Sequence, residues 1–491
     1  MSIPDVGGAA PLRVAVVGGG ISGLAVAHAL LRRARAAGRA LDLRLYEAGD
    51  RLGGKISTER QDGWVTEGGP DSFLLAKPAA LDLCRELGLG DRLIPTNAAA
   101  RTVYVLSGGC LKRLPGGLRL TAPTAWGPFL RSDLISWPGK LRMALDLVLP
   151  ARNVAGDESI GAFVRRRLGQ EALAKLADPM MAGIYMGDPE QLSLRATFPQ
   201  LAEMEQQHGS VIRGLRRGAR DARRRAAAAP GGGPLAGSLF FSLRGGSGEL
   251  VDALAKAIGS EIIHLRQAVQ AVDPITVAGE VQSDRIGYRL RLADGGEWLA
   301  DRLILAGSAP ASASLLAPWA PDIAAGIGAI PHASSALVNL GYDASAFDRP
   351  LDGYGYVVAA GEPHPIRACS WTSTKLDGRA PAGKVLLRAF FGGVGFEAET
   401  RLPDEELVAR AQAAWSLLLG LHGKPELVRV SRWPGGNPQV APGHQALVAR
   451  LVAGLPEGLS LLGAAFHGVG VPDCVRAAEA CAAAILPEQK A

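Results

Sequence analysis

The sequence predicts an α/β protein (with α+β character later in the chain) whose first unit is a parallel βαβ element. Three observations near the N-terminus predict this class. Val14–Val17 is a run of β-formers, an amphipathic helical pattern continues through Arg33, and Leu43–Tyr46 has the composition of a second short strand. A strand, a helix and a strand in this order are typical of a parallel sheet. We therefore expect a Rossmann-type unit at the start of the chain.

The turn between the first strand and the helix carries Gly18, Gly20 and Gly23 in the spacing G-x-G-x-x-G. In such a motif the first glycine permits a tight turn, the second lets the backbone approach a pyrophosphate, and the third allows close packing of the helix on the strand. Glu47 ends the second strand, 24 residues after Gly23, where a carboxylate can accept hydrogen bonds from ribose hydroxyls. These features occur together, which favours dinucleotide binding over a glycine turn in an ordinary βαβ unit.

The residues after the second strand indicate which dinucleotide is bound. Arg51, Gly54 and Lys55 belong to the segment RLGGK, an extension that many FAD oxidoreductases carry and that NAD-only dehydrogenases usually lack. Gly69 and Pro70 follow in the segment WVTEGGPDSF, and the backbone of a turn there can lie against a flavin. The sequence therefore predicts FAD.

Length and composition describe a large globular protein. The chain has 491 residues, of which 20% are charged and 5% aromatic, and its mean hydropathy of +0.13 excludes a disordered chain. Much of the net charge of +6 comes from the arginine-rich stretch Arg213–Arg225, which precedes the low-complexity segment Ala226–Gly233. A solvated helix or loop is the favoured interpretation of this stretch, ahead of a membrane-surface contact and of nucleic-acid binding. We expect no nucleic-acid partner.

Cysteine and histidine patterns exclude several classes of protein. The five cysteines are odd in number and form no C-x-x-C pair, which argues against a disulfide scaffold and a zinc cluster and fits a reducing compartment. The eight histidines show no metal-ligand spacing. Neither a signal peptide nor an apolar run of the ~20 residues that span a bilayer is visible. We expect a cytoplasmic protein, either free or in contact with the inner face of the cytoplasmic membrane.

A helical region interrupts the α/β pattern at 121–215. It combines apolar residues with few acidic ones, among them Trp126, Phe129, Leu130, Leu134, Ile135 and Trp137. This composition suits an amphipathic surface that seeks a membrane interface, and it suits the core of an ordinary helix bundle equally well. The sequence leaves both interpretations open.

Later segments predict a second, mixed sheet. An antiparallel pair is expected at Tyr288–Leu292 and Trp298–Leu305. Leu459–Ala464 predicts a strand that returns to the first unit, and Asp473–Leu486 a helix whose N-terminus would aim at a bound ring. The strands of the mixed sheet are expected at 335–342, 355–358, 367–371 and 385–391.

Each of the two sheet domains is expected to be built from separate stretches of chain. We assign three stretches to a discontinuous FAD-binding domain, namely 11–75, 239–269 and 425–486. A mixed-sheet substrate domain takes 76–120 and 270–424. The inserted helical domain, a candidate for membrane contact, takes 121–215, and a low-complexity Arg/Ala/Gly loop takes 216–238.

Several motifs together resemble the flavin-dependent porphyrinogen oxidases of haem synthesis, the protoporphyrinogen and coproporphyrinogen oxidases. The motifs are VVGGGISGLAVA, RLGGK, EGGPDSFLLAKP, MMAGIYMGDPEQLSLRATFP, LRGGSGELVDAL, SRWPGGNPQ and GVGVPDC. The first two belong to all FAD amine-oxidase-like proteins, whereas the segments Met180–Pro199 and Ser431–Gln439 are much narrower. The resemblance covers the chain from about Val14 to Leu486.

The resemblance implies a role for each matching residue. FAD would be bound by Gly18, Gly19, Gly20, Ile21, Ser22, Gly23, Glu47, Ala48, Arg51, Gly54, Lys55, Gly69, Pro70, Asp71, Ser72, Val269, Trp433, Val469, Gly470 and Val471. The porphyrinogen would be bound by Lys77, Gly183, Tyr354, Val357 and Phe390, with Lys77 anchoring a propionate and the Gly183 carbonyl polarising pyrrole N–H groups. A plain turn glycine at 183 and half-buried strand residues at 354 and 390 are the alternatives. Some relatives have an arginine at the place of Asp71 and others a phenylalanine at the place of Tyr354, which leaves the selectivity open.

The implied activity is the FAD-dependent, six-electron oxidation of protoporphyrinogen IX to protoporphyrin IX. Dioxygen would accept the electrons, and three molecules of hydrogen peroxide would form. The alternative is oxidation of coproporphyrinogen III to coproporphyrin III, followed by an amine oxidase or carotenoid desaturase of the same fold and by a non-enzymatic relative. The expected partners are the porphyrinogen, dioxygen, a membrane surface at 121–215, a ferrochelatase that receives the product, and a second copy in a homodimer.

Overall fold

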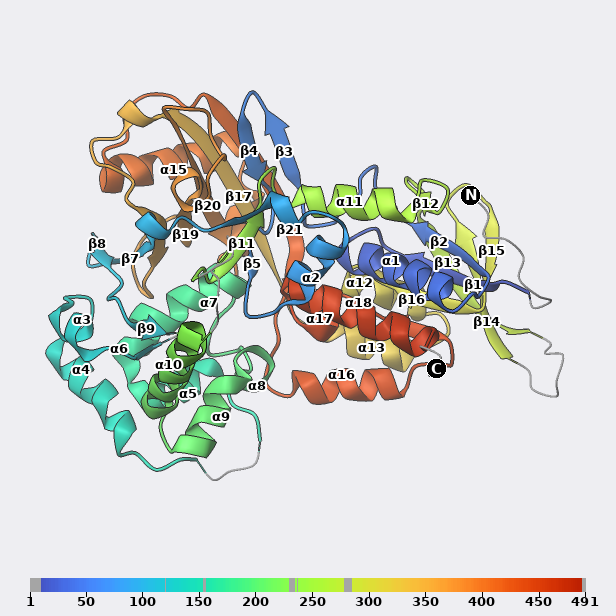
Figure 1. Ribbon diagram of the computed structural model, residues 1–491, viewed down its shortest axis with the longest axis horizontal. Helices are drawn as coiled ribbons and strands as arrows, with labels where there is room; N and C mark the ends of the chain where they lie inside the picture. Colours follow the sequence, from blue (N-terminus) through green and yellow to red (C-terminus); the bar gives the residue numbers. More distant parts are fainter. Residues whose placement is uncertain are drawn as a thin grey trace.

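The structure of the chain is a computed structural model that describes residues 10–119, 121–152, 156–228, 235, 237–277 and 285–487. Figure 1 shows three parts: a parallel sheet with its helices on the right, a mixed sheet at the upper left, and a group of helices at the lower left. The predicted class, a Rossmann-type sheet with a mixed sheet and inserted helices, is confirmed.

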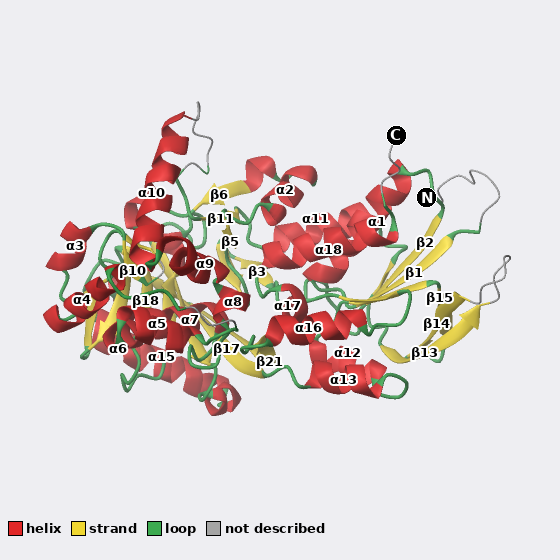
Figure 2. Ribbon diagram, turned by 90° about the horizontal axis from the view of Figure 1, so that it is seen from below, coloured by secondary structure: helices red, strands yellow, loops and turns green. Residues whose placement is uncertain are grey.

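A five-stranded parallel sheet forms the core of the first part. Its strands, in spatial order, are β12 (Ile263–His264), β2 (Leu41–Tyr46), β1 (Leu12–Val17), β16 (Arg302–Leu305) and β22 (Leu459–Leu461). Apolar side chains line both faces of this sheet, because both faces are covered. One face is covered by α1 (Ile21–Ala36), α11 (Gly248–Ile258) and α18 (Val471–Ile485). The other face, visible in Figure 2, is covered by β13 (Val269–Val277), β14 (Arg285–Leu292), β15 (Glu297–Ala300), α12 (Ala309–Leu316) and α13 (Pro321–Gly328).

The segment Trp298–Leu305, expected as one strand, forms two strands in different sheets. β15 pairs antiparallel with β14, as predicted, whereas β16 joins the parallel sheet beside β1. The chain changes sheets at Asp301, whose N–H donates to the Arg13 carbonyl at 2.8 Å and whose carboxylate lies 2.9 Å from the Arg13 guanidinium. Apolar residues lie on both sides of Asp301, so the sequence pattern does not show that the two halves pair with different sheets.

A seven-stranded mixed sheet forms the second part. Its strands, in spatial order, are β21 (Leu427–Pro438), β17 (His332–Asp343), β20 (Lys384–Gly392), β19 (Ala368–Trp371), β18 (Gly353–Val358), β7 (Thr102–Ser107) and β8 (Cys110–Arg113). All neighbours are antiparallel except β18 and β7. One face packs against α15 (Asp404–Leu419), where Trp415 shares a core with Tyr356 and Leu387. The opposite face carries part of the site described below.

Three expected domain assignments differ from the structure. β16, from the range 270–424, belongs to the parallel sheet, and β21, from the range 425–486, belongs to the mixed sheet. Residues 216–228, expected as a loop, continue the helix α10 (Val211–Ala228). Alanine and arginine are among the strongest helix formers, which explains why this low-complexity stretch is helical. Residues 229–234 and 236 of the expected loop lie outside the described residues.

Helices make up the third part. They are α3 (Trp126–Arg131), α4 (Trp137–Ala144), η3 (Leu145–Leu147), α5 (Ile160–Leu168), α6 (Gln170–Ala172), η4 (Leu173–Ala177), α7 (Asp178–Tyr185), α8 (Leu194–Thr197), α9 (Pro199–His208) and α10, which projects from the body in Figure 2. Phe129, Leu134 and Ile135 are buried in a common core, whereas Leu130 and Trp137 are exposed. The buried residues therefore fit the interpretation as a helix-bundle core, and the exposed residues fit the interpretation as a surface for a membrane interface.

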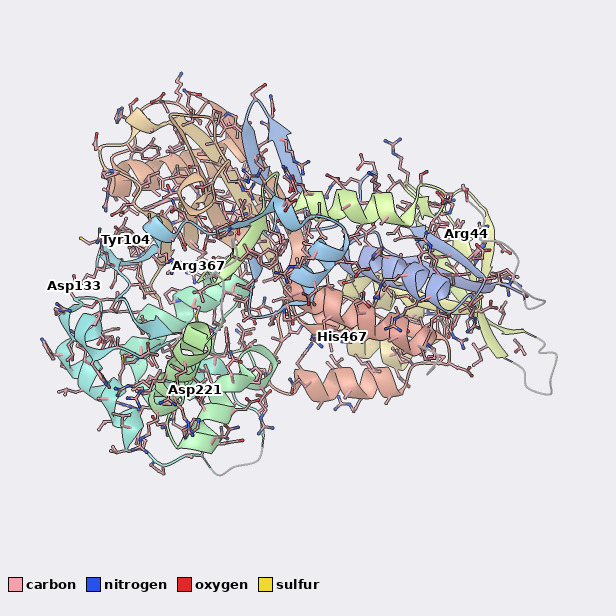
Figure 3. The ribbon with its side chains drawn as sticks, viewed as in Figure 1. Arg44, Tyr104, Asp133, Asp221, Arg367 and His467 are labelled. Atoms are coloured by element: carbon pink, nitrogen blue, oxygen red, sulfur yellow. The ribbon has the colours of Figure 1, made fainter. Side chains whose placement is uncertain are left out.

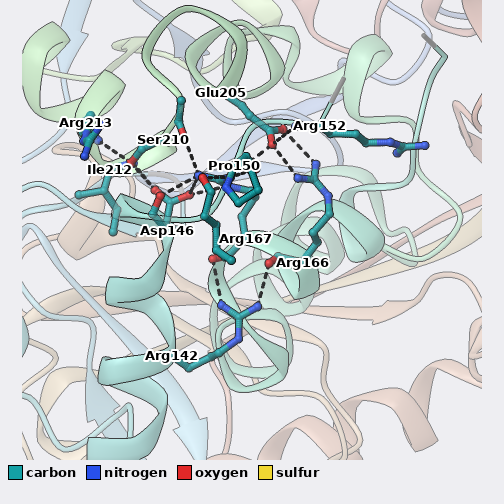
Figure 4. A network of polar contacts seen from close by, with 12 residues as sticks. Arg142, Asp146, Pro150, Arg152, Arg166, Arg167, Glu205, Ser210, Ile212 and Arg213 are labelled. Atoms are coloured by element: carbon teal, nitrogen blue, oxygen red, sulfur yellow. Dashed lines mark hydrogen bonds and ion pairs between the residues drawn. The ribbon is translucent and has the colours of Figure 1, made fainter. Parts of the chain in front are cut away.

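A buried ion pair between Arg167 and Asp146 holds this third part together (Figure 4). Arg167 Nε donates to Asp146 Oδ1 at 2.6 Å, and its Nη2 donates to the Gly209 carbonyl at 2.8 Å. The second oxygen of Asp146 accepts from Ser210 Oγ at 2.5 Å and from the N–H of Ile212 at 2.9 Å. Both charges are inaccessible to solvent, so each must be compensated within the protein. The hydrogen bonds that do so connect η3, α5, the end of α9 and α10.

Short elements connect the three parts. A three-stranded sheet of β5 (Phe73–Leu74), β11 (Phe240–Leu243) and β6 (Leu93–Pro95) brings Phe241 opposite Phe73. The remaining elements are β3 (Thr58–Gln61), β4 (Trp64–Glu67), β5 (Phe73–Leu74), α2 (Ala79–Glu86), η1 (Gly90–Arg92), β6 (Leu93–Pro95), η2 (Ala98–Ala100), β9 (Leu118–Arg119), β10 (Ala122–Pro123), β11 (Phe240–Leu243), η5 (Ala344–Ala346), α14 (Thr372–Lys375), η6 (Glu397–Arg401), α16 (His444–Ala453) and α17 (Ala464–His467). The segments that follow β4 and precede α18 meet at the candidate site.

Candidate flavin and substrate site

Gly20 leaves an open cradle at the N-terminus of α1. A Cβ on Gly18, whose φ is +114°, would lie 2.7 Å from the Gly307 amide nitrogen, and one on Gly23 would lie 1.9 Å from the Gly18 carbonyl oxygen. A Cβ on Gly20 would have the Cα of Gly54 as its nearest contact, at 4.0 Å. Gly20 is also the N-cap of α1, whose first N–H groups lack intrahelical partners and attract a phosphate. The cradle therefore fits the pyrophosphate of FAD.

Glu47 stands at the end of β2, beside this cradle. Its Oε2 accepts from the N–H of Gly19 at 2.7 Å, and its Oε1 accepts from the N–H of Gly49 at 2.8 Å. The N–H of Gln267 donates to the Glu47 carbonyl at 2.9 Å, which brings the start of β13 at Val269 close to this corner. The corner joins the carboxyl ends of neighbouring parallel strands, where dinucleotides bind. The ribose and adenine roles of these residues remain predictions.

The loop after β2 faces the cradle from the other side. Arg51 donates to three backbone carbonyls of its own loop, including that of Gly54 at 2.7 Å, and its guanidinium carbon lies 5.8 Å from the centre of the Trp433 ring. Lys55 Nζ donates to the Gly436 carbonyl. Arg51 therefore shapes this loop, while the Gly54 backbone lies against Gly20.

The turn from Gly69 to Ser72 is packed tightly between that loop and the mixed sheet. A Cβ on Gly69 would lie 1.9 Å from the Lys55 carbonyl oxygen. Trp433 Nε1 donates to the Gly68 carbonyl at 2.5 Å, so the indole is fixed against the same turn. Pro70 accepts at its carbonyl from Ser247 Oγ at 2.8 Å. Trp433 on β21 of the mixed sheet is thus held against the turn that carries the other predicted ring-binding residues.

The Asp71 side chain is committed to the chain's own cations. Lys375 Nζ lies 2.9 Å from Asp71 Oδ1, and Arg388 Nη2 lies 2.8 Å from Asp71 Oδ2. Burial alone would raise the pKa of Asp71, but the Lys375 ammonium and the Arg388 guanidinium outweigh it and hold this pKa well below its ordinary value. The Asp71 carboxylate is therefore already paired, and the predicted contact with the cofactor would be made by the main chain of Asp71. Lys375 and Arg388 were missed at the sequence level, because no local pattern distinguishes them.

The N-terminus of α18 carries the other predicted ring-binding residues. α18 begins at Val471, with Gly470 as its N-cap and Val469 just before it. In its first turn, Asp473 Oδ2 accepts from Lys77 Nζ at 2.6 Å. Asp473 was not singled out from the sequence, and its carboxylate competes for Lys77 with any propionate that approaches. The remaining predicted FAD residues lie beside the cradle: Ile21 and Ser22 form the first turn of α1, and Ala48 lies in the loop after β2.

Three of the predicted substrate residues lie together. The register of the mixed sheet sets Val357 opposite Ala368, and Ala368 opposite Phe390, so these side chains project from one face. Gly183 on α7 contacts the same place, since its Cβ position is 3.8 Å from Cγ1 of Val357. Tyr354 stands at a bulge in β18 and donates its hydroxyl hydrogen to a loop carbonyl at 2.8 Å. Val357, Phe390 and Gly183 can therefore line one flat surface.

The Gly183 carbonyl is free at the C-terminal end of α7. The N–H groups that cap this end, those of Met186 and Gly187, bond to the carbonyls of Ala182 and Met181. Among the residues that the structure describes, no N–H is bonded to the oxygen of Gly183. The C-terminal end of a helix carries partial negative charge, so this oxygen is a ready acceptor for an N–H of a ligand.

Contacts at both ends hold α7 against the mixed sheet. Arg367, labelled in Figure 3, has Nη2 3.8 Å from Asp178 Oδ2, and its guanidinium carbon lies 4.2 Å from the centre of the Phe396 ring. Burial raises the pKa of Asp178, and the charge of Arg367 offsets part of this rise. Gln439 Nε2 donates to the Tyr185 carbonyl at 3.0 Å at the other end. The Gly183 carbonyl is therefore held in a fixed position.

Comparisons with known proteins match this arrangement. The family model of the flavin containing amine oxidoreductases matches residues 21–486. Coproporphyrinogen III oxidase of Propionibacterium freudenreichii is 37% identical over 94% of this chain and 88% of its own. The same enzyme of Bacillus subtilis is 34% identical over 94% of this chain and 95% of its own. Protoporphyrinogen oxidase 1 of Spinacia oleracea is 29% identical over 96% of this chain and 83% of its own.

Solved structures agree. A crystal structure of a protein described as a putative protoporphyrinogen oxidase, from Exiguobacterium, superimposes with a TM-score of 0.82 at 31% identity, covering 98% of this chain and all of that one. Cyclohexylamine oxidase from Brevibacterium oxydans, at 18% identity and a TM-score of 0.65, shares the fold. The resemblance to the porphyrinogen oxidases is thereby confirmed. The chain belongs to the flavin containing amine oxidoreductase family, and its cofactor is FAD.

Proposed function

We propose that this chain oxidises coproporphyrinogen III to coproporphyrin III in haem synthesis, with three molecules of dioxygen reduced to three of hydrogen peroxide. The observation that carries this proposal is the sequence identity of 31–37% to coproporphyrinogen III oxidases over nearly the whole of both chains. Protoporphyrinogen IX, the substrate expected first from the sequence, becomes the second candidate. The spinach relative favours it at lower identity.

The chain supplies binding and orientation for this reaction. Bound FAD would supply the redox chemistry, as carrier of two electrons from the substrate to dioxygen in each of three turnovers. The cradle at Gly20 and the N-terminus of α1 bind the pyrophosphate, and Glu47 accepts from the ribose. The turn from Gly69 to Ser72, together with Trp433 and the start of α18, holds the ring in place.

The Gly183 carbonyl is the acceptor that we assign to the pyrrole N–H groups. Six hydrogens leave a porphyrinogen as three hydrides from bridge carbons and three protons, of which two come in net terms from N–H groups and one from the remaining bridge carbon. A fixed partial negative charge beside the N–H groups eases the loss of their protons. Glycine at this position leaves the main chain open to a flat macrocycle, and the residue is exposed. Phe390 and Val357 on the adjacent sheet face would contact the ring, and Lys77 would bind a propionate.

Aerobic turnover of the two porphyrinogens, measured side by side, tests the proposal. Porphyrin fluorescence and peroxide are followed with coproporphyrinogen III and with protoporphyrinogen IX. We expect a larger kcat/KM for coproporphyrinogen III and one peroxide for every two electrons. A larger value for protoporphyrinogen IX would move the assignment to the second candidate. A yellow protein whose flavin is reduced by dithionite, but which oxidises neither, would contradict both.

A membrane contact through the helical part remains a second proposal. Trp137, Leu141, Leu145 and Val148 follow one another at helical spacing along α4, η3 and the C-cap of η3, and they are 62%, 67%, 47% and 75% exposed. Tryptophan and leucine on one exposed helix face suit the boundary between lipid headgroups and acyl chains. Within the described residues no helix is long and apolar enough to cross a bilayer, so this contact would be peripheral.

Co-sedimentation with vesicles of anionic phospholipid measures this contact. The double substitution Trp137→Ser and Leu141→Ser should reduce the bound fraction severalfold. Leu417→Ser is the matched control, because Leu417 is 84% exposed on α15, away from the helical part. Equal loss in both proteins, or no binding by the unaltered chain, would rule the contact out.

The homodimer and the transfer of product to a ferrochelatase remain predictions from the resemblance.

A further inference from the structure

A cluster of buried charges lies directly beneath the turn from Gly69 to Ser72. Its centre is Asp71, both of whose carboxylate oxygens are bound by cations, Lys375 from α14 and Arg388 from β20. The side chains of Asp71 and Arg388 are 7% and 4% exposed. Lys375 and Arg388 are 304 and 317 residues away from Asp71 along the chain. The cluster therefore joins the turn of the first part to the sheet of the second.

Arg388 does more than neutralise Asp71. Its Nη1 donates to the Gly69 carbonyl at 2.8 Å and to the Glu67 carbonyl at 3.4 Å. The same guanidinium lies 4.8 Å from the centre of the Phe390 ring, two residues further along β20. One side chain thus contacts the main chain of the turn assigned to the flavin ring and the aromatic ring assigned to the substrate.

The chemistry of arginine suits both tasks. Its planar fork can hold a carboxylate and a carbonyl at once in fixed directions, which a lysine ammonium does less rigidly. Lys375 and Arg388 together carry one positive charge more than Asp71 neutralises, and a net positive charge under the turn would stabilise a ring that becomes anionic on reduction. Because the surroundings are shielded from solvent, this charge acts through a medium of low dielectric constant.

We propose that Arg388 is a positioning residue for the reaction. It holds the backbone from Glu67 to Asp71 at a fixed distance from Phe390, so that ring and substrate meet in register, and its charge favours the reduced flavin. The inference rests on the proposed function, because it takes the flavin to lie against this turn and the porphyrinogen against Phe390.

Arg379 provides a matched control. It is as buried as Arg388 and also lies near the turn, but its guanidinium donates to the carbonyls of Arg244 and Leu243 and to Ser242 Oγ, at 2.8–2.9 Å. It bonds neither to Gly69 nor to the Asp71 carboxylate. If this region simply required a buried arginine, substitution of Arg379 and substitution of Arg388 would therefore have the same effects.

The experiment compares the holoenzyme with its Arg388→Met, Arg388→Lys and Arg379→Met variants. Four quantities are measured: the unfolding midpoint, the FAD dissociation constant, the two-electron midpoint potential of the flavin, and kcat with KM. For Arg388→Met we expect the reduction equilibrium to shift about tenfold toward the oxidised flavin, about 30 mV for a two-electron couple, with kcat also lowered about tenfold. Arg388→Lys should restore the potential but not the full kcat. Arg379→Met should lower the unfolding midpoint and leave the potential and kcat near those of the unaltered enzyme.

Two results would overturn the inference. Equal shifts of potential in Arg388→Met and Arg379→Met would show that the contact with Gly69 has no special role. A wild-type potential and kcat in Arg388→Met and Arg388→Lys, with stability alone reduced, would make the cluster purely structural. The potential and the FAD affinity are measured without substrate, so they test Arg388 even if neither porphyrinogen is oxidised and the proposed function fails.

Discussion

Substitution of Gly20 by valine separates cofactor binding from folding. The backbone of Gly20 has φ −72° and ψ 176°, an extended conformation that a β-branched residue adopts without strain. Its Cβ would have no protein atom closer than 4.0 Å. As Gly20 is the N-cap of α1, and valine is a poor N-cap, we expect a loss of about 1 kcal/mol in the unfolding free energy of the apoprotein.

The loss of FAD binding free energy should equal or exceed this loss of unfolding free energy. The two methyl groups of valine would occupy the space through which a pyrophosphate approaches the backbone. Overpacking of a filled site costs about 1–3 kcal/mol, and each 1.4 kcal/mol is a factor of ten in affinity. The FAD dissociation constant should therefore rise roughly 5- to 150-fold, and the purified protein should lose its yellow colour.

Titration of the apoprotein with FAD, followed by quenching of flavin fluorescence, measures this change, and urea unfolding of the apoprotein measures the fold. Gly23→Ala is the contrasting variant, since its Cβ would lie 1.9 Å from the Gly18 carbonyl oxygen. It should unfold the first part even without FAD. Wild-type FAD affinity in Gly20→Val would refute the placement of the cofactor. A loss of apoprotein stability as large as in Gly23→Ala would refute the open cradle.

Four further substitutions test charges in the structure. Asp71→Asn should flatten the fall of unfolding free energy below about pH 4, because a carboxyl with a lowered pKa stabilises the fold above its unfolded pKa and loses this as pH falls, by up to about 1.4 kcal/mol per pH unit. Arg167→Met should cost about 3–5 kcal/mol in urea unfolding, because Asp146 is left buried and unpaired. Lys77→Met should raise KM for coproporphyrinogen about 10- to 100-fold at nearly constant kcat, the value of one charge-assisted bond, whereas Asp473→Asn should lower KM.

A control variant or a contrary result tests the predictions for Arg167, Asp71 and Lys77. Arg410→Met removes an exposed pair with Glu406 and should cost less than about 1 kcal/mol, so an equal cost at Arg167 would contradict the role of burial. An unchanged pH profile in Asp71→Asn would mean that this carboxyl is not ionised in the native state. A drop in kcat with unchanged KM in Lys77→Met would exclude Lys77 as the anchor of a propionate.

Local sequence was sufficient for much of the fold. Glycine spacing, β-former runs and helical periodicity report backbone conformations that depend on near neighbours, so β1, α1, β2 and the strands of the mixed sheet lie close to where they were expected. The same holds for the cradle, because Gly20 and its helix are adjacent in sequence. Misplaced features were those whose outcome depends on distant partners. The segment Trp298–Leu305 divides at Asp301 because Arg13 and β1 are available to pair with it.

The sequence by itself determined the family, the cofactor and the order of the elements, since these are written in contiguous motifs. Only the tertiary structure decided which charges meet. Asp71 is bound by Arg388 across 317 residues and Lys77 by Asp473 across 396. Likewise, burial separated Phe129 in the helical core from the exposed Trp137, although both are apolar residues in one helical stretch. Ion pairing and burial depend on distance in space, which no pattern of neighbouring residues contains.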